Sequence, residues 1–245
     1  MRAPASRVAV VSACVAALVG CAAPVDGAPV VHIVEAAKPS PSRPLNQVLP
    51  TADELTSALG GAGFMGQQVD GGPDMLLAGV GESEATPVEC VSATFRLQKV
   101  VYQSSPVRAV ASESWAGGDA NGPTTSGFFG AVKFATPDDA QAFFASSAQK
   151  WQRCNGQTLV IHQPQHGADG ASRITDVDID AHVVSAVVMQ ESGGSASPPI
   201  QRALGLASDC VVDVEVTDAG GAADVGGAHD AVDVANLMLS KVGAF

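Results

Sequence analysis

Two histidines have a spacing that could support metal chemistry. His162 and His166 lie four residues apart, as two zinc ligands on one helix face would. Pro164 between them interrupts a helix, and the sequence contains neither an HExxH nor a CxxC motif. We therefore interpret both histidines as exposed loop residues and expect no metal site.

Three aspartates alternate along a predicted strand and could offer carboxylates to calcium. They are Asp176, Asp178 and Asp180. An EF-hand calcium loop also needs a glycine and a bidentate glutamate, and neither is present at the required spacing. Because the aspartates alternate with Val177 and Ile179, we interpret them as the solvated face of a half-buried strand.

Hydrolysis would require a nucleophile on a sharp turn between a strand and a helix. The sequence contains no GxSxG motif, and its five histidines are scattered. The glycines at 60–63 and 117–118 do not lie between a strand and a helix, as those of phosphate-binding loops do. We predict that the protein is not an enzyme and holds no cofactor. A cell-envelope hydrolase is the remote alternative.

The beginning of the sequence has the features of an export signal. Arg2 and Arg7 precede an apolar run, residues 8–19. This run is shorter than the 20 or so residues that a bilayer span needs. Residues 18–21 (LVGC) resemble the lipobox of bacterial lipoproteins, in which a peptidase cuts before the cysteine and the thiol carries a diacylglycerol. We expect residues 1–20 to be a signal peptide and Cys21 to carry acyl chains that anchor the chain on the outer face of the cell membrane. An ordinary secretory signal that happens to contain Cys21 is the alternative.

The mature chain is strongly acidic. Removal of Arg2 and Arg7 with the signal leaves 11 basic residues against 25 acidic ones, a net charge near −14. Such a surface repels nucleic acid and anionic lipid headgroups. We therefore expect no nucleic-acid partner, and we expect membrane attachment through the acyl chains on Cys21 alone.

Three cysteines remain in the exported part, namely Cys90, Cys154 and Cys210. Cysteines outside the cytosol are expected to pair, and three of them allow one bridge in any of three pairings. Cys210 begins an alternating, β-branched stretch, where a thiol that faces the core behaves as a small hydrophobic residue. We predict a disulfide between Cys90 and Cys154 and a free thiol at Cys210.

The elements that position these residues follow a tether. Residues 21–50 contain six prolines, which favour an extended path, and an apolar island at residues 30–34 interrupts them. The folded domain is predicted to span residues 51–245. The chain is 46% hydrophobic, which is enough for a packed core.

Capping signals predict the helices of this domain. Thr51 and Glu54 form a capping box for a helix that ends at residues 60–61. Thr136 and Pro137 begin a longer helix that ends after Cys154, and an apolar stripe over residues 231–242 predicts a terminal helix. Residues 90–99 fit either a helical turn or a strand. Strands are predicted near residues 75–80, 128–134, 158–161, 174–179, 182–190 and 210–217, with a possible one at 200–207. Short turns between strands favour antiparallel pairing, so the fold class is α+β.

Several short motifs, taken in order, resemble the PknH-like extracellular sensor domain. They are residues 102–105 (YQSS), residues 151–156 (WQRCNG), which are similar to the WxxCxG block of the family, residues 201–204 (QRAL) and residues 211–214 (VVDV). The resemblance covers about residues 45–243. The domain of this family lies outside the membrane on a mycobacterial receptor kinase, and it also occurs alone on mycobacterial lipoproteins.

The resemblance implies a single α+β domain with a twisted antiparallel sheet, flanking helices and an open cleft. It implies a first disulfide at the positions of Cys90 and Cys154. The second disulfide of the family would involve Ile200 and a position after residue 215, and neither carries a cysteine. Cys210 is therefore not a remnant of that bridge, and any rigidity that the second bridge gives the cleft is in doubt.

Tyr102 and Trp115 are candidate cleft residues, because aromatic residues are scarce here and ligand clefts combine apolar and polar groups. Core packing is the alternative for both. The sequence thus predicts a non-catalytic lipoprotein whose external domain binds an unknown small molecule, a cell-wall fragment or an envelope protein. An envelope scaffold or assembly factor is the second interpretation.

Overall fold

The computed structural model describes residues 44–119, 122–162, 169–192, 195–218 and 227–242. All of them belong to one compact unit, residues 41–245. The predicted cleavage after residue 20, the acylated Cys21 and the apolar island at residues 30–34 lie outside the described residues. Among the described residues, no helix combines the length and the hydropathy that a membrane span requires.

The described strands form one sheet in which every ladder is antiparallel, as predicted. Its order is β1-β4-β5-β11-β10-β8-β7-β6-β3, while β2 also pairs with β4 and β9 pairs with β8. The strands are β1 (Gly63–Met65), β2 (Val69–Gly71), β3 (Ala85–Thr86), β4 (Val107–Asp119), β5 (Gly122–Phe134), β6 (Thr158–Ile161), β7 (Gly170–Ile179), β8 (Val183–Ser192), β9 (Ser195–Ala196), β10 (Ile200–Ala207) and β11 (Cys210–Asp218).

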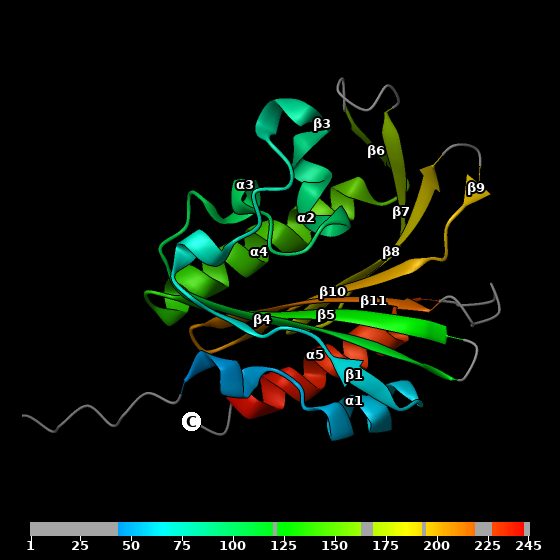
Figure 1. Ribbon diagram of the computed structural model, residues 1–245. Coiled ribbons are helices and arrows are strands. Elements are labelled where there is room, and N and C mark those ends of the chain that lie inside the picture. The colour runs from blue at the N-terminus through cyan, green and yellow to red at the C-terminus, as the bar shows by residue number, and fades with distance from the viewer. Residues whose placement is uncertain (1–43, 120–121, 163–168, 193–194, 219–226, 243–245) are drawn as a thin grey trace, which may run out of the picture. The chain divides into compact units, whose positions relative to one another are not determined.

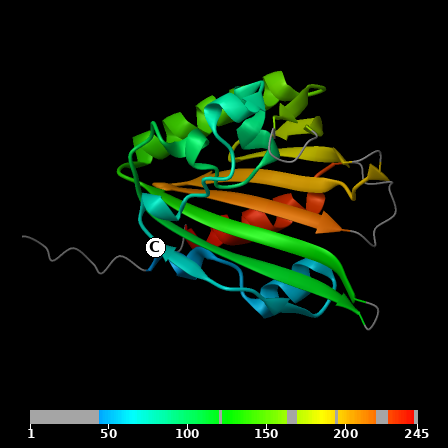
Figure 2. The same cartoon turned by 45° about the horizontal axis from the view of Figure 1, so that its top comes forward.

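Helices cover both faces of this sheet (Figures 1 and 2). One face carries α2, α3 and α4, and the other carries α1 and α5 (Figure 1). The helices are α1 (Ala52–Leu59), α2 (Val91–Thr94), α3 (Lys99–Tyr102), α4 (Pro137–Cys154) and α5 (His229–Val242), with the short 3-10 helices η1 (Leu45–Val48), η2 (Pro73–Met75), η3 (Glu82–Glu84) and η4 (Val88–Cys90). The α+β prediction is confirmed.

The α4 layer follows from the capping signals in the sequence. The Thr136 hydroxyl accepts a hydrogen bond from the Asp139 backbone N–H, so α4 begins where predicted. The helix then buries Phe143 and Trp151 at helical spacing against the sheet. A disulfide between Cys90 and Cys154 joins η4 to the last residue of α4, which confirms the predicted pairing.

The opposite layer begins earlier in the chain than the sequence predicts. The capping box of Thr51 and Glu54 starts α1 as expected. However, Val48 and Leu49, which were assigned to the tether, are buried against the α5 side of the sheet. The described fold therefore includes η1, because the apolar side chains around residue 48 pack in the core. The prolines of this segment favoured an extended tether and gave no sign of these core contacts.

The segment between α1 and β4 differs most from the prediction. The strand expected at residues 75–80 is absent: η2 ends there, and Leu77 makes a single bridge to Gln98. The Gly-rich stretch before it, for which the sequence predicts no strand, contributes β1 and β2. Both are three residues long and pair with β4, so long-range backbone pairing overrides weak local propensity.

Candidate functional site

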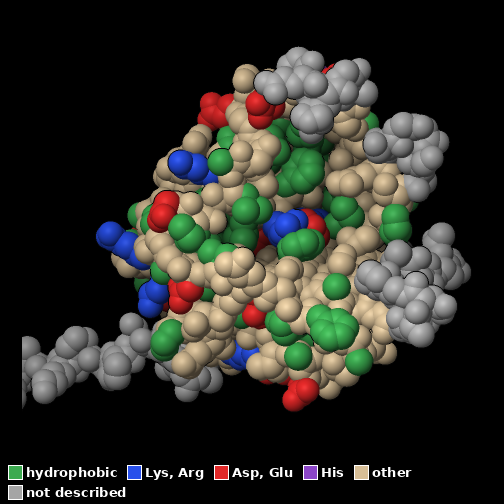
Figure 3. All heavy atoms as spheres, in the orientation of Figure 1, with side chains coloured by type: hydrophobic (Ala, Val, Ile, Leu, Met, Phe, Trp, Pro, Cys, Tyr) green, Lys and Arg blue, Asp and Glu red, His purple; other side chains and the backbone are tan. Residues whose placement is uncertain are grey.

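A hollow opens on the sheet face that carries α2 and α3. Figure 3 shows it near the middle of this face of the molecule, where basic, acidic and hydrophobic side chains meet. We call it the Arg96 cleft; its volume is about 170 Å³. Its lining residues are Gln67, Leu77, Arg96, Leu97, Ser112, Glu113, Ser114, Phe128 and Phe129.

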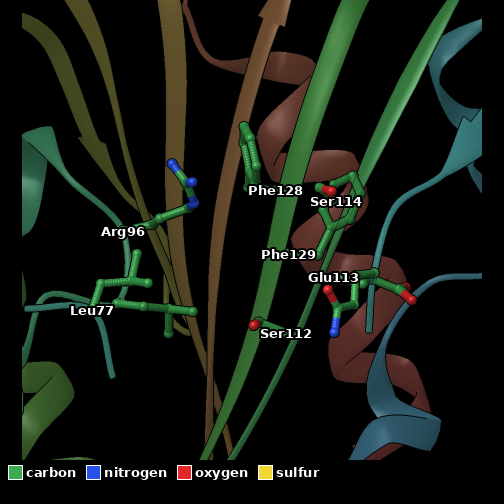
Figure 4. A pocket seen from close by; sticks show the side chains of 9 residues that line it. Leu77, Arg96, Ser112, Glu113, Ser114, Phe128 and Phe129 are labelled. Carbon is green, nitrogen blue, oxygen red and sulfur yellow. The ribbon is translucent and has the colours of Figure 1, made fainter. Parts of the chain in front are cut away.

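The Arg96 guanidinium is held in place on this cleft. Its Nη1 donates a hydrogen bond to Glu215 Oε1 at 2.8 Å, and its Cζ lies 3.5 Å from the centre of the Phe128 ring. Figure 4 shows Arg96 and Phe128 facing each other, with Ser112 and Ser114 on β4. The two serines are two residues apart and share a face of the strand. The cleft therefore presents an oriented cation, an aromatic ring and two hydroxyls.

A network of buried charges lies behind Arg96. Arg202, which is fully buried on β10, donates from Nη2 to Asp213 Oδ1 at 2.7 Å and lies 3.6 Å from Glu215 Oε2. Arg96 reaches the other oxygen of Glu215. Two guanidiniums and two carboxylates thus balance in charge, so the network keeps no net charge inside the sheet layer.

Leu97 connects this network to the wall of the cleft. Its φ of 49° is in the left-handed region, which costs a branched residue about 1 kcal/mol or more. Its N–H donates to Asp213 Oδ2 at 2.8 Å, and its carbonyl accepts from the Leu77 N–H at 2.9 Å. A Cβ on Gly130 would come within 2.7 Å of the Leu97 side chain, so only glycine leaves room there. The backbone beside Arg96 is fixed by its surroundings.

The structure places both candidate aromatic residues in the core. Tyr102 is 1% exposed, stacks on Phe143 with ring centroids 4.5 Å apart, and donates its hydroxyl to Asp213 at 3.0 Å. Burial, together with the Asp213 charge, raises the pKa of Tyr102 well above its usual value. Trp115 is 2% exposed on the other face, where its ring fills the space above Gly63 and Gly117. Neither residue lines the Arg96 cleft.

Cys210 is the buried free thiol that the sequence predicts. Burial, with a smaller contribution from the Asp209 charge, raises its pKa to about 12. A thiol with such a pKa remains protonated at neutral pH and is a poor nucleophile. Cys210 is therefore a packing residue of β11.

One arrangement resembling a catalytic triad was not predicted from the sequence. Thr86 Oγ1 lies 3.1 Å from His162 Nε2, and His162 Nδ1 lies 3.2 Å from Asp169 Oδ2. All three side chains are exposed, and none of them lines the Arg96 cleft. A triad also needs a shaped pocket and oxyanion donors to hold a substrate. The chain of hydrogen bonds fastens β3 to the end of β6.

The described residues that were considered for metal binding form no metal-binding group. His166 lies outside the described residues, and His162 contacts Thr86 and Asp169 only through the hydrogen bonds given above. Asp176 has a φ of 51° at an irregularity between β7 and β8, and Asp178 and Asp180 are exposed. In the ranges that the structure describes, no three His, Cys, Asp or Glu side chains form a group that could hold a metal ion.

Comparison with known proteins adds two findings. Residues 40–241 match the family described as the PknH-like extracellular domain. The serine/threonine-protein kinases PknH of Mycobacterium bovis and Mycobacterium tuberculosis are each 32% identical to this chain over 83 residues, which is 34% of the chain and 13% of the kinase. The chain therefore matches only a small part of the length of those kinases.

A solved structure shares the fold. The crystal structure of the extracellular domain of PknH from Mycobacterium tuberculosis superimposes with a TM-score of 0.68 at 20% identity. The match covers 83% of this chain and 99% of that domain. The arrangement of sheet and helices described above is thus the fold of that domain.

Proposed function

Since this chain belongs to the PknH-like extracellular domain family, we propose that it is an exported lipoprotein whose domain binds a small ligand in the Arg96 cleft without catalysing a reaction. The observation that carries the proposal is the Arg96 guanidinium, held against Phe128 and Glu215 at the wall of a cavity. Preorganised polar groups in a concave site are typical of ligand recognition.

The lining of the cleft indicates the chemistry of its ligand. Arg96 and the hydroxyls of Ser112 and Ser114 can donate hydrogen bonds, while Leu77 and Phe128 offer apolar surface. A cavity of about 170 Å³ suits one small group rather than a large molecule. We expect a polar molecule with hydrogen-bond acceptors and one apolar side, such as part of a cell-wall fragment.

A thermal-shift experiment tests the cleft. The purified full-length protein is heated with fractions of cell-envelope extract, beside a Ser112→Ala/Ser114→Ala variant that removes both hydroxyls without changing the charge. A Gln149→Ala variant on the exposed side of α4 is the matched control. We expect at least one fraction to raise the melting temperature of the wild type and the control but not of the double variant. Null results with every fraction, or equal shifts in all three proteins, would overturn the proposal.

The proposal that the domain is not catalytic has its own test. A hydrolase would turn over ester or peptide substrates, and the hydroxyl nearest to a base among those described above is that of Thr86. We expect the wild type to show no turnover above that of a Thr86→Val variant. Turnover that disappears in this variant would support the hydrolase interpretation instead.

Membrane attachment is proposed through acyl chains on Cys21. An extracellular domain family and a lipobox both support export, and the acidic mature chain offers no basic patch to hold a membrane. Replacing Cys21 with Ala should release the protein from membranes, while Cys210→Ala, which changes a buried thiol, should leave it attached. Mass spectrometry of the mature N-terminus should show the lipid. Tight attachment of the Cys21→Ala variant would contradict acylation.

One observation favours a protein partner as a second candidate function. Phe64 is 87% exposed on β1, the strand at one edge of the sheet. An exposed aromatic residue on an edge strand is a common anchor for another protein. Cross-linking in cells should trap one dominant envelope protein, and Phe64→Ser should lose it while Val88→Ser, an exposed residue on η4, should not. No dominant partner, or one that survives Phe64→Ser, would exclude this candidate.

A further inference from the structure

A second cavity lies on the other face of the sheet, between β4, η1, α1 and the end of α5. Its volume is about 350 Å³, and we call it the Glu113 pocket. Its lining residues are Asn46, Gln47, Leu49, Pro50, Thr51, Ala52, Met65, Gln68, Glu113 and Lys241. Glu113 is the residue that it shares with the Arg96 cleft.

An irregularity at the sheet edge places Glu113 between the two cavities. β1 ends at Met65 opposite Trp115, and β2 begins at Val69 opposite Ser112. Three residues, 66–68, therefore face only two residues of β4. Gln67 lines the Arg96 cleft and Gln68 lines the Glu113 pocket. Such bulges redirect side chains and are enriched at binding sites.

The Glu113 carboxyl has an unsatisfied oxygen. Its Oε1 is buried, and no described residue offers it a hydrogen bond. Native proteins bond the great majority of their buried polar atoms, so an exception needs a reason. In Figure 4 the side chain extends from β4 away from Arg96. Burial raises the pKa of Glu113 to about 7, with the opposing effect of Lys241 and a further increase from the Glu54 charge.

The charges around Glu113 come from two helices. Lys241 on α5 donates from Nζ to Glu54 Oε2 on α1 at 2.6 Å and to the Leu49 carbonyl at 2.7 Å. Partial burial disfavours the Glu54 carboxylate, but the hydrogen bonds from Lys241 and Thr51 outweigh it and lower the pKa of Glu54. Lys241 is thus committed to Glu54. When Glu113 is ionised, the carboxylates of Glu113 and Glu54 and the ammonium group of Lys241 together carry a net charge of −1.

We propose that the Glu113 pocket is a second binding site, which takes a small molecule carrying a protonated amine. The ammonium group would donate to Glu113 Oε1, and the side-chain oxygens of Asn46, Gln47 and Gln68 offer further acceptors. The apolar part of the ligand would contact the apolar lining residues Leu49, Pro50, Ala52 and Met65. The site is distinct from the cleft of the proposed function, although Glu113 borders both.

A proton competes with this ligand for Glu113. An ammonium binds the carboxylate and not the neutral acid, and Glu113 is half protonated near pH 7. Binding should therefore weaken as the pH falls through 7. For a group with this pKa, the apparent Kd at pH 6 should be about tenfold higher than at pH 8.

Matched amines and alcohols test the proposal on the full-length protein. The probes are n-butylamine and cyclohexylamine, with 1-butanol and cyclohexanol as neutral counterparts of the same shape, titrated calorimetrically at pH 8 and pH 6. We expect saturable binding of at least one amine, no binding of its alcohol, and the tenfold loss at pH 6. Glu113→Gln should abolish amine binding, while Glu89→Gln, which removes an exposed carboxylate on η4, should keep it.

Several results would overturn the proposal. They are no binding by either amine, equal binding by an amine and its alcohol, or unchanged amine binding by Glu113→Gln. If neither amine binds, the Glu113 carboxyl serves only to hold solvent. If Glu113→Gln melts below the wild type by more than a few degrees, Gln68→Ala provides the second variant and should weaken the amine several-fold. The Ser112→Ala/Ser114→Ala variant should bind amines normally, so this proposal and that of the Arg96 cleft can fail separately.

Discussion

Two carboxyl groups of the same sheet have opposite environments. Asp213 lies on β11 near the middle of the sheet, and both of its oxygens are occupied: Oδ1 by Arg202, and Oδ2 by the Leu97 N–H and the Tyr102 hydroxyl. Glu113 lies on β4 beside the bulge at the sheet edge, and its Oε1 has no partner among the described residues. The oxygens of Asp213 are hydrogen-bonded within the protein, whereas Oε1 of Glu113 is available to accept a hydrogen bond from a ligand.

The position in the sheet explains this difference. Asp213 has strands on both sides and helices above and below, so the surrounding chain supplies donors to both of its oxygens. Glu113 faces the gap between β1 and β2, where its Oε1 finds no donor among the described residues. A buried carboxylate whose oxygens are both bonded helps to specify a fold, whereas a perturbed carboxyl with an unpaired oxygen beside a cavity indicates a binding site.

The largest effect should come from opening the Asp213 network. Replacing Asp213 with Ala leaves the buried Arg202 guanidinium with only its longer ion-pair contact, to Glu215, and such a loss lowers the free energy of unfolding by about 3 to 5 kcal/mol. Urea unfolding followed by circular dichroism measures it. The control Asp233→Ala removes an exposed carboxylate on α5 and should change stability by less than about 0.5 kcal/mol. A loss as small as that of the control would mean that Asp213 is not structural.

Removal of the disulfide should weaken the same layer by a somewhat smaller amount. Cys90 and Cys154 close a loop with a sequence separation of 64, and their replacement by Ala should cost about 2 to 4 kcal/mol through the entropy of the unfolded chain. Unfolding of the variant and of the reduced wild type should agree. The bridge joins η4 to α4, far from α1 and α5 in the fold, so amine binding at Glu113 should persist in the folded variant. Loss of that binding would show that the two layers are coupled.

Local sequence signals were sufficient to predict the helices that have a clear cap or a clear apolar stripe. The caps at Thr51 and Thr136 and the apolar stripe of α5 predict three helices correctly, because a cap or a stripe depends on residues within one or two turns. The alternation in β11 likewise predicts a strand. The pairing of Cys90 with Cys154 followed from the strand context of Cys210 and from the family resemblance.

Neither of the two cavities could be predicted in this way. Asp213 and Glu215 alternate with valines, a pattern that indicates a strand but does not say that its polar face is buried; only the α4 layer and Arg202 from β10 decide that. Arg96 and Glu113 become candidate site residues through residues that are distant in the sequence, such as Glu215 for Arg96 and Lys241 for Glu113. Tyr102 and Trp115, chosen because aromatics are scarce, fill the core for the same reason, since a chain with few large side chains uses them there.

Removal of the Tyr102 hydroxyl tests a single hydrogen bond to Asp213. Tyr102→Phe removes one donor to Asp213 and keeps the ring on Phe143, so we expect a loss of about 1.5 to 3 kcal/mol, the range for a hydrogen bond to a charged group. The same change in the Asp213→Ala background should cost much less, because its partner is gone. Equal losses in the two backgrounds, determined by urea unfolding, would show that the hydroxyl stabilises the core independently of Asp213.

The smallest effect, and the one opposite in sign, is expected at Glu113. Because its pKa is raised from 4.5 to about 7 in the folded protein, the folded state binds a proton more tightly than the unfolded chain does. The stability that this proton contributes is complete below pH 4.5 and is lost as the pH rises through 7. Solvent screens this half-buried carboxyl, so the wild type should lose only about 1 kcal/mol relative to Glu113→Gln between pH 5 and pH 8.

Comparing the two proteins at each pH separates Glu113 from all other titrating groups. Glu54, whose pKa is lowered, contributes stability that disappears as the pH falls, and it does so in both proteins. Urea midpoints at pH 5, 6, 7 and 8 should therefore give a difference that grows towards pH 8, with Glu113→Gln the more stable protein there. Glu89→Gln should show no such trend. A difference that stays flat with pH would mean that the fold satisfies the Glu113 carboxylate as fully as it satisfies Asp213, and the contrast between the two groups would not hold.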